Sequence, residues 1–224
     1  MPNYRNLLLA TAASALAIAA GAAAAEQTAL VLYESKAAEP AKRQDGIAFV
    51  ELDPGSPDYG RILAQMPLPA DFHSHHIFYN PTRDRAYVTS LNLSELRVLD
   101  VTEFPYRAKT ISVPDCEVGE DISFSEVQNK WYLTCMGSSV VVVGDATTDE
   151  VLGTIDMPAP WPHGIATHDG IDRQLVTSTA NPSDPTQFGE EIVVLRPSTG
   201  EVVSTHKLST DASPSGTAPV EAFF

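Results

Sequence analysis

A unit of four short apolar runs recurs along this chain, and this repeat limits the folds open to it. The clearest copy spans residues 71–114, and polar turns separate its apolar runs. Two more copies follow, in which the equivalent residues Val88, Leu133 and Val176 are 45 and 43 residues apart. Four strands in about 40–50 residues are typical of β-propeller blades. The alternative is a β-sandwich with evenly spaced strands, but sandwiches rarely repeat a four-strand pattern so closely.

Residues before the first regular copy form a further unit of the same kind. Strands are expected at 28–34, 46–52 and 61–67, and this unit contributes the outer strands of its blade. The chain 26–224 therefore holds about four four-stranded blades of an all-β propeller. Residues 218–224 are predicted to open a fifth blade. Because closed rings usually have more blades, we expect the missing blades of a seven-bladed ring to come from a longer chain or a second chain.

Residues 1–25 have the pattern of a secretory signal peptide. Arg5 supplies a positive start, residues 7–20 are apolar and uncharged, and Ala23–Ala25 offers a cleavage site before Glu26. A single membrane anchor is the alternative, although the apolar stretch is borderline in length for a span. Cleavage predicts a periplasmic or secreted protein that has no membrane segment after processing.

The net charge of the chain argues against two classes of partner. The formal charge is −15, and removing residues 1–25 takes away Arg5 but no acidic residue, which leaves −16. Such a domain repels nucleic-acid phosphates and anionic lipid surfaces. We therefore expect no nucleic-acid partner and no membrane partner, whereas metal ions and other cations remain suitable ligands.

The chain contains two cysteines, Cys116 and Cys135, and both lie in one repeat unit. Export and an even count favour a disulfide, which would add about 3 kcal/mol through loop closure. A hairpin turning at 128–129 would instead place Cys135 opposite Ile122, away from Cys116. The sequence leaves these two arrangements open.

Candidate ligands recur where successive inner strands begin. The innermost strands of a propeller line its central channel, so rotation about the axis would bring their first residues together. The predicted metal ligands are His75, His76, His163, His73 and Glu221, and further candidates are Cys116, Glu117, Glu120, His168 and His206. Imidazole binds copper, zinc, iron and nickel, and carboxylates add oxygen donors. Since adjacent strand residues point to opposite faces, only one of His75 and His76 is expected to face the axis.

Several short motifs resemble the selenium-binding protein/methanethiol oxidase family and keep its order. They are Asp53–Gly60, Met66–Pro69 with the following His75-His76, Cys116-Glu117, Pro162–Gly164, Ser178–Pro182 and Pro219–Glu221. The resemblance implies a seven-bladed propeller and copper-dependent oxidation of methanethiol to formaldehyde, hydrogen peroxide and sulfide, with His75 and His76 at the metal. The chain departs from the family in lacking paired cysteines after His76, and it is about half as long as a full-length member.

Two functions follow from these observations. In the first, the exported propeller holds copper or a similar ion near its axis and oxidises a small-molecule thiol. In the second, a looser YVTN-type periplasmic propeller serves as a non-catalytic binding scaffold, and its histidines are simply solvated. Metal content separates the two functions, because only the first requires a bound ion.

Overall fold

The structure is a computed structural model that describes residues 27–35, 39, 42–210 and 216–224. The predicted signal peptide, residues 1–25, lies outside this part of the chain. Within the described residues, no helix is long and apolar enough to cross a membrane.

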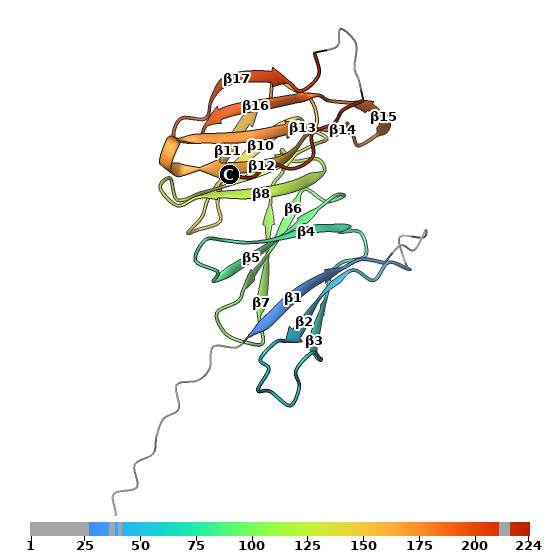
Figure 1. Cartoon of the computed structure of the whole chain (residues 1–224). Coiled ribbons are helices and arrows are strands. Elements are labelled where there is room, and N and C mark those ends of the chain that lie inside the picture. Colours follow the sequence, from blue (N-terminus) through green and yellow to red (C-terminus); the bar gives the residue numbers. More distant parts are fainter. Residues whose placement is uncertain (1–26, 36–38, 40–41, 211–215) are drawn as a thin grey trace, which may run out of the picture.

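The described chain is all-β, as predicted, and folds into an arc of four antiparallel sheets with one additional hairpin (Figure 1). Sheet I contains β1 (Thr28–Tyr33), β2 (Gly46–Glu51) and β3 (Ile62–Pro67). Sheet II contains β4 (Ser74–Tyr79), β5 (Arg85–Ser90), β6 (Glu95–Asp100) and β7 (Arg107–Ser112). Sheet III contains β8 (Gly119–Ser125), β9 (Lys130–Cys135), β10 (Val140–Asp145) and β11 (Val151–Asp156). Sheet IV contains β12 (Pro162–His168), β13 (Arg173–Ser178), β16 (Glu191–Arg196) and β17 (Glu201–Lys207). A 3₁₀ turn, η2 (Asp169–Ile171), joins β12 to β13.

Three apolar cores fill the spaces between neighbouring sheets. Phe49 of sheet I packs in one core with Val88 of sheet II, and Tyr87 of sheet II packs in the next with Trp131 of sheet III. The third core joins Tyr132 of sheet III to Val176 of sheet IV. Both faces of each inner sheet are therefore buried against other sheets, which is the reason that the repeat predicts a propeller-like arrangement.

Sheets II, III and IV each have four strands, which we number from the inner strands β4, β8 and β12 to the outer strands β7, β11 and β17. The three strands of sheet I correspond to the second, third and outer strands of these sheets. In each sheet, the residue after the outer strand donates its N–H to the carbonyl of the residue before the third strand. The four pairs are Leu68 to Asp45, Val113 to Ser94, Met157 to Ser139 and Leu208 to Glu190. This alignment makes β2 a third strand and β1 a second strand. Among the described residues, no strand occupies the inner position of sheet I.

The structure differs from the sequence-based expectation at two places in sheet IV and beyond it. Residues 216–224 form no strand, because no second strand of a fifth sheet lies beside them in the described chain. Val220 nevertheless lies against sheet IV, and its carbonyl accepts hydrogen bonds from the Gly164 N–H at 3.1 Å and the Thr177 hydroxyl at 2.7 Å. A small hairpin of β14 (Ala180–Asn181) and β15 (Asp184–Phe188), which the repeat did not predict, separates β13 from β16.

Cys116 and Cys135 form a disulfide. The expected register is wrong: Cys135 pairs with Gly119, and Ile122 pairs with Leu133, because a bulge lies between Gly119 and Ile122. The bulge shortens the path back to Cys116. The disulfide therefore ties the entry of β8 to the end of β9.

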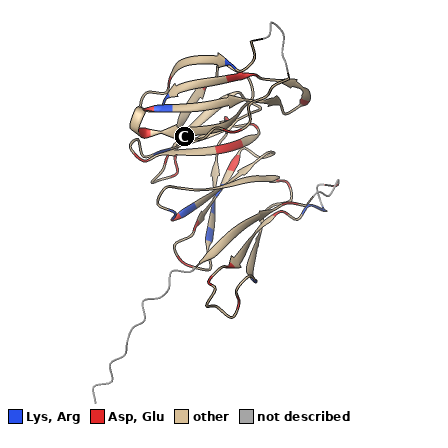
Figure 2. Cartoon of the chain, in the orientation of Figure 1, with Lys and Arg blue, Asp and Glu red and all other residues tan. Residues whose placement is uncertain are grey.

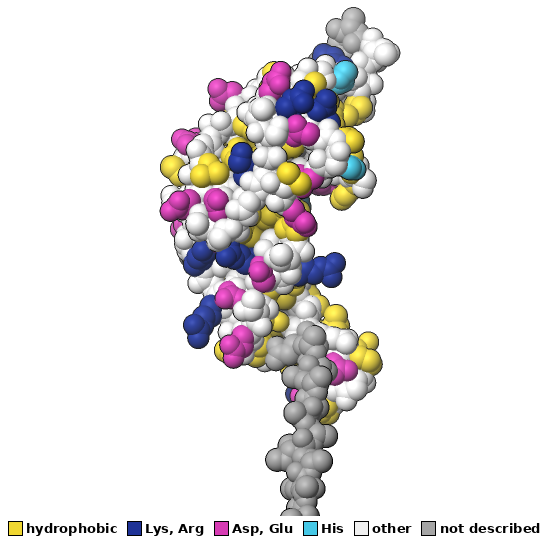
Figure 3. Space-filling view, turned by 90° about the vertical axis from the view of Figure 1, so that its left-hand side faces the viewer, with side chains coloured by type: hydrophobic (Ala, Val, Ile, Leu, Met, Phe, Trp, Pro, Cys, Tyr) yellow, Lys and Arg dark blue, Asp and Glu magenta, His cyan; other side chains and the backbone are white. Residues whose placement is uncertain are grey.

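Charged residues of both signs are interspersed on the face that Figure 3 shows. Figure 2 shows acidic residues on β8, a strand that carries no Lys or Arg. Negative charge is thus placed on an inner strand of sheet III, beside the inner strands of its neighbours.

A buried carboxylate, Asp149, links sheets II and III. Asp149 lies in the turn between β10 and β11 and is 3% exposed. It accepts a hydrogen bond from the Tyr87 hydroxyl at 2.5 Å, and it pairs with Arg85 at 3.1 Å and Lys109 at 2.6 Å. All three partners belong to sheet II, so this one side chain fixes the position of sheet III against it.

We predict that Asp149→Ala strongly destabilises the fold. The substitution leaves the buried Tyr87 hydroxyl and the partly buried Arg85 without this carboxylate, and removing one member of a buried ion pair typically costs about 3–5 kcal/mol. Urea unfolding measures the difference. The control is Asp156→Ala at an exposed position on β11, where a change within about 0.5 kcal/mol is expected. A loss no larger than the control's would contradict the proposed link.

Candidate metal centre

The inner strands β4, β8 and β12 begin in the same unusual way. The residue directly before each of these strands is a non-glycine residue in the left-handed region. These residues are His73 (φ 49°), Val118 (φ 56°) and Trp161 (φ 55°). A bulge then interrupts the pairing with the second strand, between Ser74 and Ile77, Gly119 and Ile122, and Pro162 and Ile165. The left-handed residue turns the chain inward, and the bulge adds a residue to the inner strand.

A threonine hydroxyl on each second strand holds the bulge in place. The hydroxyls of Thr89, Thr134 and Thr177 accept hydrogen bonds from the N–H groups of His76, Asp121 and Gly164, at 3.1, 3.0 and 2.8 Å. The Thr134 and Thr177 hydroxyls also donate to the carbonyls of His163 and Val220 in the next unit. The bulges of successive units are therefore connected, and Val220-Glu221 occupies the same position as His75-His76, Glu120-Asp121 and His163-Gly164.

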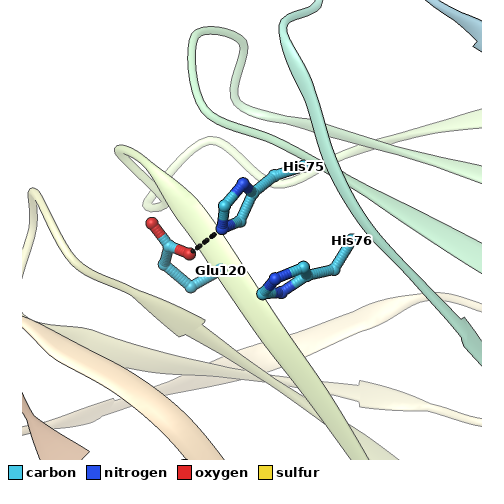
Figure 4. Close-up of side chains that lie close together, drawn as sticks. All are labelled: His75, His76 and Glu120. Atoms are coloured by element: carbon cyan, nitrogen blue, oxygen red, sulfur yellow. Dashed lines mark ion pairs between the residues drawn. The ribbon is translucent and has the colours of Figure 1, made fainter. Parts of the chain in front are cut away.

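The bulge explains why the expectation for His75 and His76 is wrong. Adjacent residues in a regular strand point to opposite faces, but a bulge places two residues opposite one. Both imidazoles turn to the same side of β4, and their ring centroids are 3.9 Å apart (Figure 4). Both residues can therefore take part in one site.

These positions bring six side chains together, which we call the His/carboxylate cluster: His75, His76, Glu120, Asp121, His163 and Glu221. His75 Nε2 lies 2.8 Å from Glu120 Oε2, and His76 Nδ1 lies 2.7 Å from Asp121 Oδ1. His163 connects Glu120 to Glu221, because its Nε2 is 3.4 Å from Glu120 Oε2 and its Nδ1 is 3.7 Å from Glu221 Oε1.

The cluster contains two sets of three donors that are close enough together to hold a metal ion. One set is His75, His76 and Glu120, and the other is Asp121, His163 and Glu221. Within each set, one ligand atom from each residue lies within 4.8 Å of the others. Three imidazoles and three carboxylates form a nitrogen and oxygen donor set that suits divalent transition metals.

Two buried atoms of the cluster fit a bound cation. Glu120 is 3% exposed, and its Oε2 lies 2.8 Å from His75 Nε2, but neither this oxygen nor the buried Nδ1 of His163 makes a hydrogen bond of good geometry with any described residue. Leaving such atoms unsatisfied costs free energy. The two atoms lie in different donor sets, so a metal ion in each set would give each of them a partner.

The carboxylates shift the pKa values inside the cluster. A hydrogen bond to Asp121 raises the pKa of His76 above its usual value. Burial alone would raise the pKa of Asp121, but hydrogen bonds from His76 and Glu221 hold it below its usual value. Burial, and then the neighbouring Asp121, raise the pKa of Glu221 to about 7. In the absence of a bound ion, the cluster therefore favours the ionised form of Asp121 and the protonated form of His76.

A cavity of about 870 Å³ opens beside the cluster. Its polar wall includes His75, His76, Asp121 and Glu221, and its apolar wall comes from β1, β4, β8 and β12. A small molecule bound there would contact the cluster on one side and aliphatic side chains on the other.

Of the other sequence candidates, the structure places four away from the two donor sets. His73 shapes the entry to β4, and Glu117 is exposed before β8. His168 lies at the far end of β12 against the ring of Phe224, and His206 is exposed on the outer strand β17. Cys116 is held in the disulfide. Asp121 was not among the candidates, although its place in the repeat is that of His76.

Asp45, which precedes β2, fixes the beginning of β4. Its carboxylate accepts the N–H of Ser74 at 3.2 Å and pairs with Arg43 at 2.9 Å. Burial alone would raise the pKa of Asp45, but the bond from Arg43 and the backbone N–H groups of Ser35 and Ser74 hold it below the usual 3.8. Sheet I thus supports the residue directly before His75.

We predict that the fold loses stability at acid pH because protonation removes the stabilising contribution of the Asp45 carboxylate. Since its folded-state pKa is lowered, its contribution is present above pH 3.8 and is lost as the pH falls through the lower folded-state value. Asp45→Asn should be less stable than the parent at about pH 6, and the difference should shrink at about pH 3. Urea unfolding at both values tests this, with exposed Asp115→Asn as the control. A difference that stays the same at both pH values would refute the prediction.

Comparison with solved structures shows the fold. The chain is similar to a hypothetical selenium-binding protein from Sulfolobus tokodaii, with a TM-score of 0.69 and 15% identity over 82% of this chain and 49% of that chain. It is also similar to hydrazine synthase from Kuenenia stuttgartiensis, with a TM-score of 0.56 and 13% identity over 74% of this chain and 46% of that one. A functionally unknown protein from Desulfotomaculum acetoxidans gives a TM-score of 0.54 and 10% identity, over 75% and 51%.

The chain spans about half the length of these proteins. No family model and no curated protein matches the sequence.

Proposed function

We propose that this chain is an exported metal-binding β-propeller, and that its His/carboxylate cluster holds copper or a similar divalent ion used to oxidise a small thiol. The observation that carries the proposal is the convergence of three imidazoles and three carboxylates from three inner strands and the 218–224 segment. Two buried atoms in this group, Glu120 Oε2 and His163 Nδ1, lie beside other members of the cluster but make no hydrogen bond of good geometry with any described residue.

The donor chemistry supports an ion of intermediate hardness. Imidazole nitrogen suits copper, zinc, iron and nickel, whereas six carboxylate or carbonyl oxygens would suit calcium or magnesium. The two cysteines of the chain are joined in a disulfide and supply no thiolate ligand. Copper in its divalent state fits this nitrogen and oxygen set, and it is also the ion that the family resemblance implies.

Carboxylates of the chain itself orient two of the imidazoles. Asp121 holds His76 through Nδ1, which leaves Nε2 of that ring as the atom that faces a ligand. Glu120 holds His75 in the same way through Nε2. Such carboxylate–imidazole pairs fix the ring orientation and increase the basicity of the ligand.

The cavity and the structural likeness support a small thiol as substrate. The apolar walls of the cavity suit an alkyl group, and its polar wall lies at the cluster. The similar structure from Sulfolobus tokodaii is described as selenium-binding, and thiol sulfur is chemically close to selenium. A bound copper ion would accept electrons from the thiol and pass them to dioxygen. For methanethiol, one dioxygen and one water are consumed, and formaldehyde, sulfide and hydrogen peroxide are formed.

We predict that the protein, purified without a histidine tag, binds copper in a way that depends on the cluster. The double variant His75→Ala/His76→Ala and the isosteric variant Glu120→Gln should each lower the copper affinity by at least about tenfold. Elemental analysis and titration with copper measure this, and circular dichroism confirms that the variants fold. His206→Ala is the matched control, because it removes an exposed imidazole outside the cluster. Equal copper binding by the parent and the double variant would rule the site out.

A second measurement tests the reaction itself. We predict that the copper-loaded protein forms hydrogen peroxide and sulfide from methanethiol, and that Glu120→Gln lowers this rate together with the copper content. His206→Ala should keep the rate of the parent. Copper bound at the cluster without thiol oxidation would leave a metal-binding propeller and remove the enzymatic part of the proposal. Absence of copper binding would favour the non-catalytic scaffold.

A further inference from the structure

We propose that the Cys116–Cys135 disulfide is a positioning element of the His/carboxylate cluster, and that it replaces a serine hydroxyl that has the same role at the two neighbouring inner strands. The disulfide holds the entry of β8 and thereby keeps Glu120 and Asp121 in place as ligands. This consequence for the ligands rests on the proposed function, because it assumes a metal ion at the cluster. The fixing of β8 itself requires no bound ion.

The second strands of sheets II, III and IV end in a repeated pair of residues. The pairs at the ends of β5, β9 and β13 are Thr89-Ser90, Thr134-Cys135 and Thr177-Ser178. In all three pairs, the threonine hydroxyl holds the bulge of the inner strand, and the residue after the threonine is at most 1% exposed. Cys135 therefore stands where the other two sheets have a buried serine.

The two serines hold the entries of β4 and β12. The hydroxyl of Ser90 donates to the carbonyl of Phe72, and the hydroxyl of Ser178 donates to the carbonyl of Pro160. Each acceptor directly precedes the left-handed residue that begins its inner strand. Each hydroxyl thus ties the end of a second strand to the turn that directs the inner strand towards the cluster.

The disulfide makes the equivalent connection in sheet III. Cys116 lies two residues before the left-handed Val118, and its bond to Cys135 joins the end of β9 to this turn. The backbone confirms the alignment, because the residue after each second strand donates its N–H to the carbonyl of the left-handed residue. The three pairs are Leu91 to His73, Met136 to Val118 and Thr179 to Trp161, at 3.0, 2.9 and 3.1 Å.

Cys116 is itself anchored to sheet II and lies against the start of β8. Its carbonyl accepts a hydrogen bond from the Ser94 hydroxyl at 2.7 Å, and its N–H donates to the carbonyl of Val113 at 2.9 Å. A Cβ atom added to Gly119 would meet Cys116 Sγ at 3.6 Å. The disulfide therefore supports the residue directly before Glu120.

The charges on β8 explain why this strand has a covalent link where the others have a hydrogen bond. Its bulge carries two adjacent carboxylates, Glu120 and Asp121, which are 3% and 4% exposed, whereas the bulges of β4 and β12 carry none. Adjacent buried carboxylates repel each other and are better hydrated outside the protein. Since Glu120 belongs to one donor set and Asp121 to the other, a displacement of β8 would weaken both sets.

The test compares Cys116→Ala/Cys135→Ala with Cys116→Ala/Cys135→Ser. Both variants lack the disulfide, and neither has a thiol that could bind copper. We expect the alanine variant to bind copper at least about tenfold more weakly than the parent. The serine variant should recover most of the affinity, because its hydroxyl can donate to the Glu117 carbonyl as Ser90 does to Phe72. Since both variants lose the same loop closure, and circular dichroism confirms that they fold, the difference between them reports positioning.

Amide hydrogen exchange without added metal provides a second readout. The N–H of Asp121, which donates to the Thr134 hydroxyl, should exchange at least about tenfold faster in the alanine variant than in the serine variant. The N–H of His76 on β4 is the control and should exchange equally in both. Equal copper affinities, or equal exchange at Asp121, would overturn the proposal. A parent protein that binds no copper would refute the proposed metal site, and the exchange rates would then decide the role of the disulfide.

Discussion

No sheet of this molecule can bury both of its faces alone, and the rest of the structure depends on this constraint. The strands of each sheet are short, and their apolar residues lie on both faces, so a neighbouring sheet must cover each side. The three cores between sheets I, II, III and IV are the result. Stacking of this kind places the inner strands β4, β8 and β12 side by side, although their first residues are more than 40 residues apart in sequence. The His/carboxylate cluster is a consequence of that stacking.

The repeat predicted the strands and their order well, because apolar runs and polar turns alternate along the sequence with a regular period. It did not predict the geometry of the inner-strand entries. A bulge depends on a left-handed residue and on a hydroxyl from the next strand. The left-handed residues His73, Val118 and Trp161 share no residue type, and although a threonine recurs on each second strand, the repeat does not show what its hydroxyl binds. The expectation that His75 and His76 face opposite sides failed for this reason. Asp121 was missed for the same reason, since in a regular strand it would point away from Glu120.

The sequence predicted which residues form the candidate site better than it predicted how those residues are arranged. His75, His76, His163 and Glu221 stand at equivalent positions of successive units, and rotational symmetry alone brings them together. Sequence could not show how the charges are balanced. The cluster places three carboxylates beside three imidazoles, and the bond between Asp121 and His76 raises one pKa while it lowers the other. The balance allows acidic residues to remain buried, because each buried carboxylate has an imidazole within reach.

The same threonine-linked chain of bulges extends through the site to its last ligand. Thr134 binds the carbonyl of His163, and Thr177 binds the carbonyl of Val220, so each inner strand is positioned by the second strand of the unit before it. Glu221 is therefore placed by sheet IV, and it is the most exposed member of its donor set. The bonds from Gly164 and Thr177 to the Val220 carbonyl are the contacts that bring this last carboxylate beside Asp121 and His163. The same device that positions the first imidazoles of the cluster thus positions its last ligand.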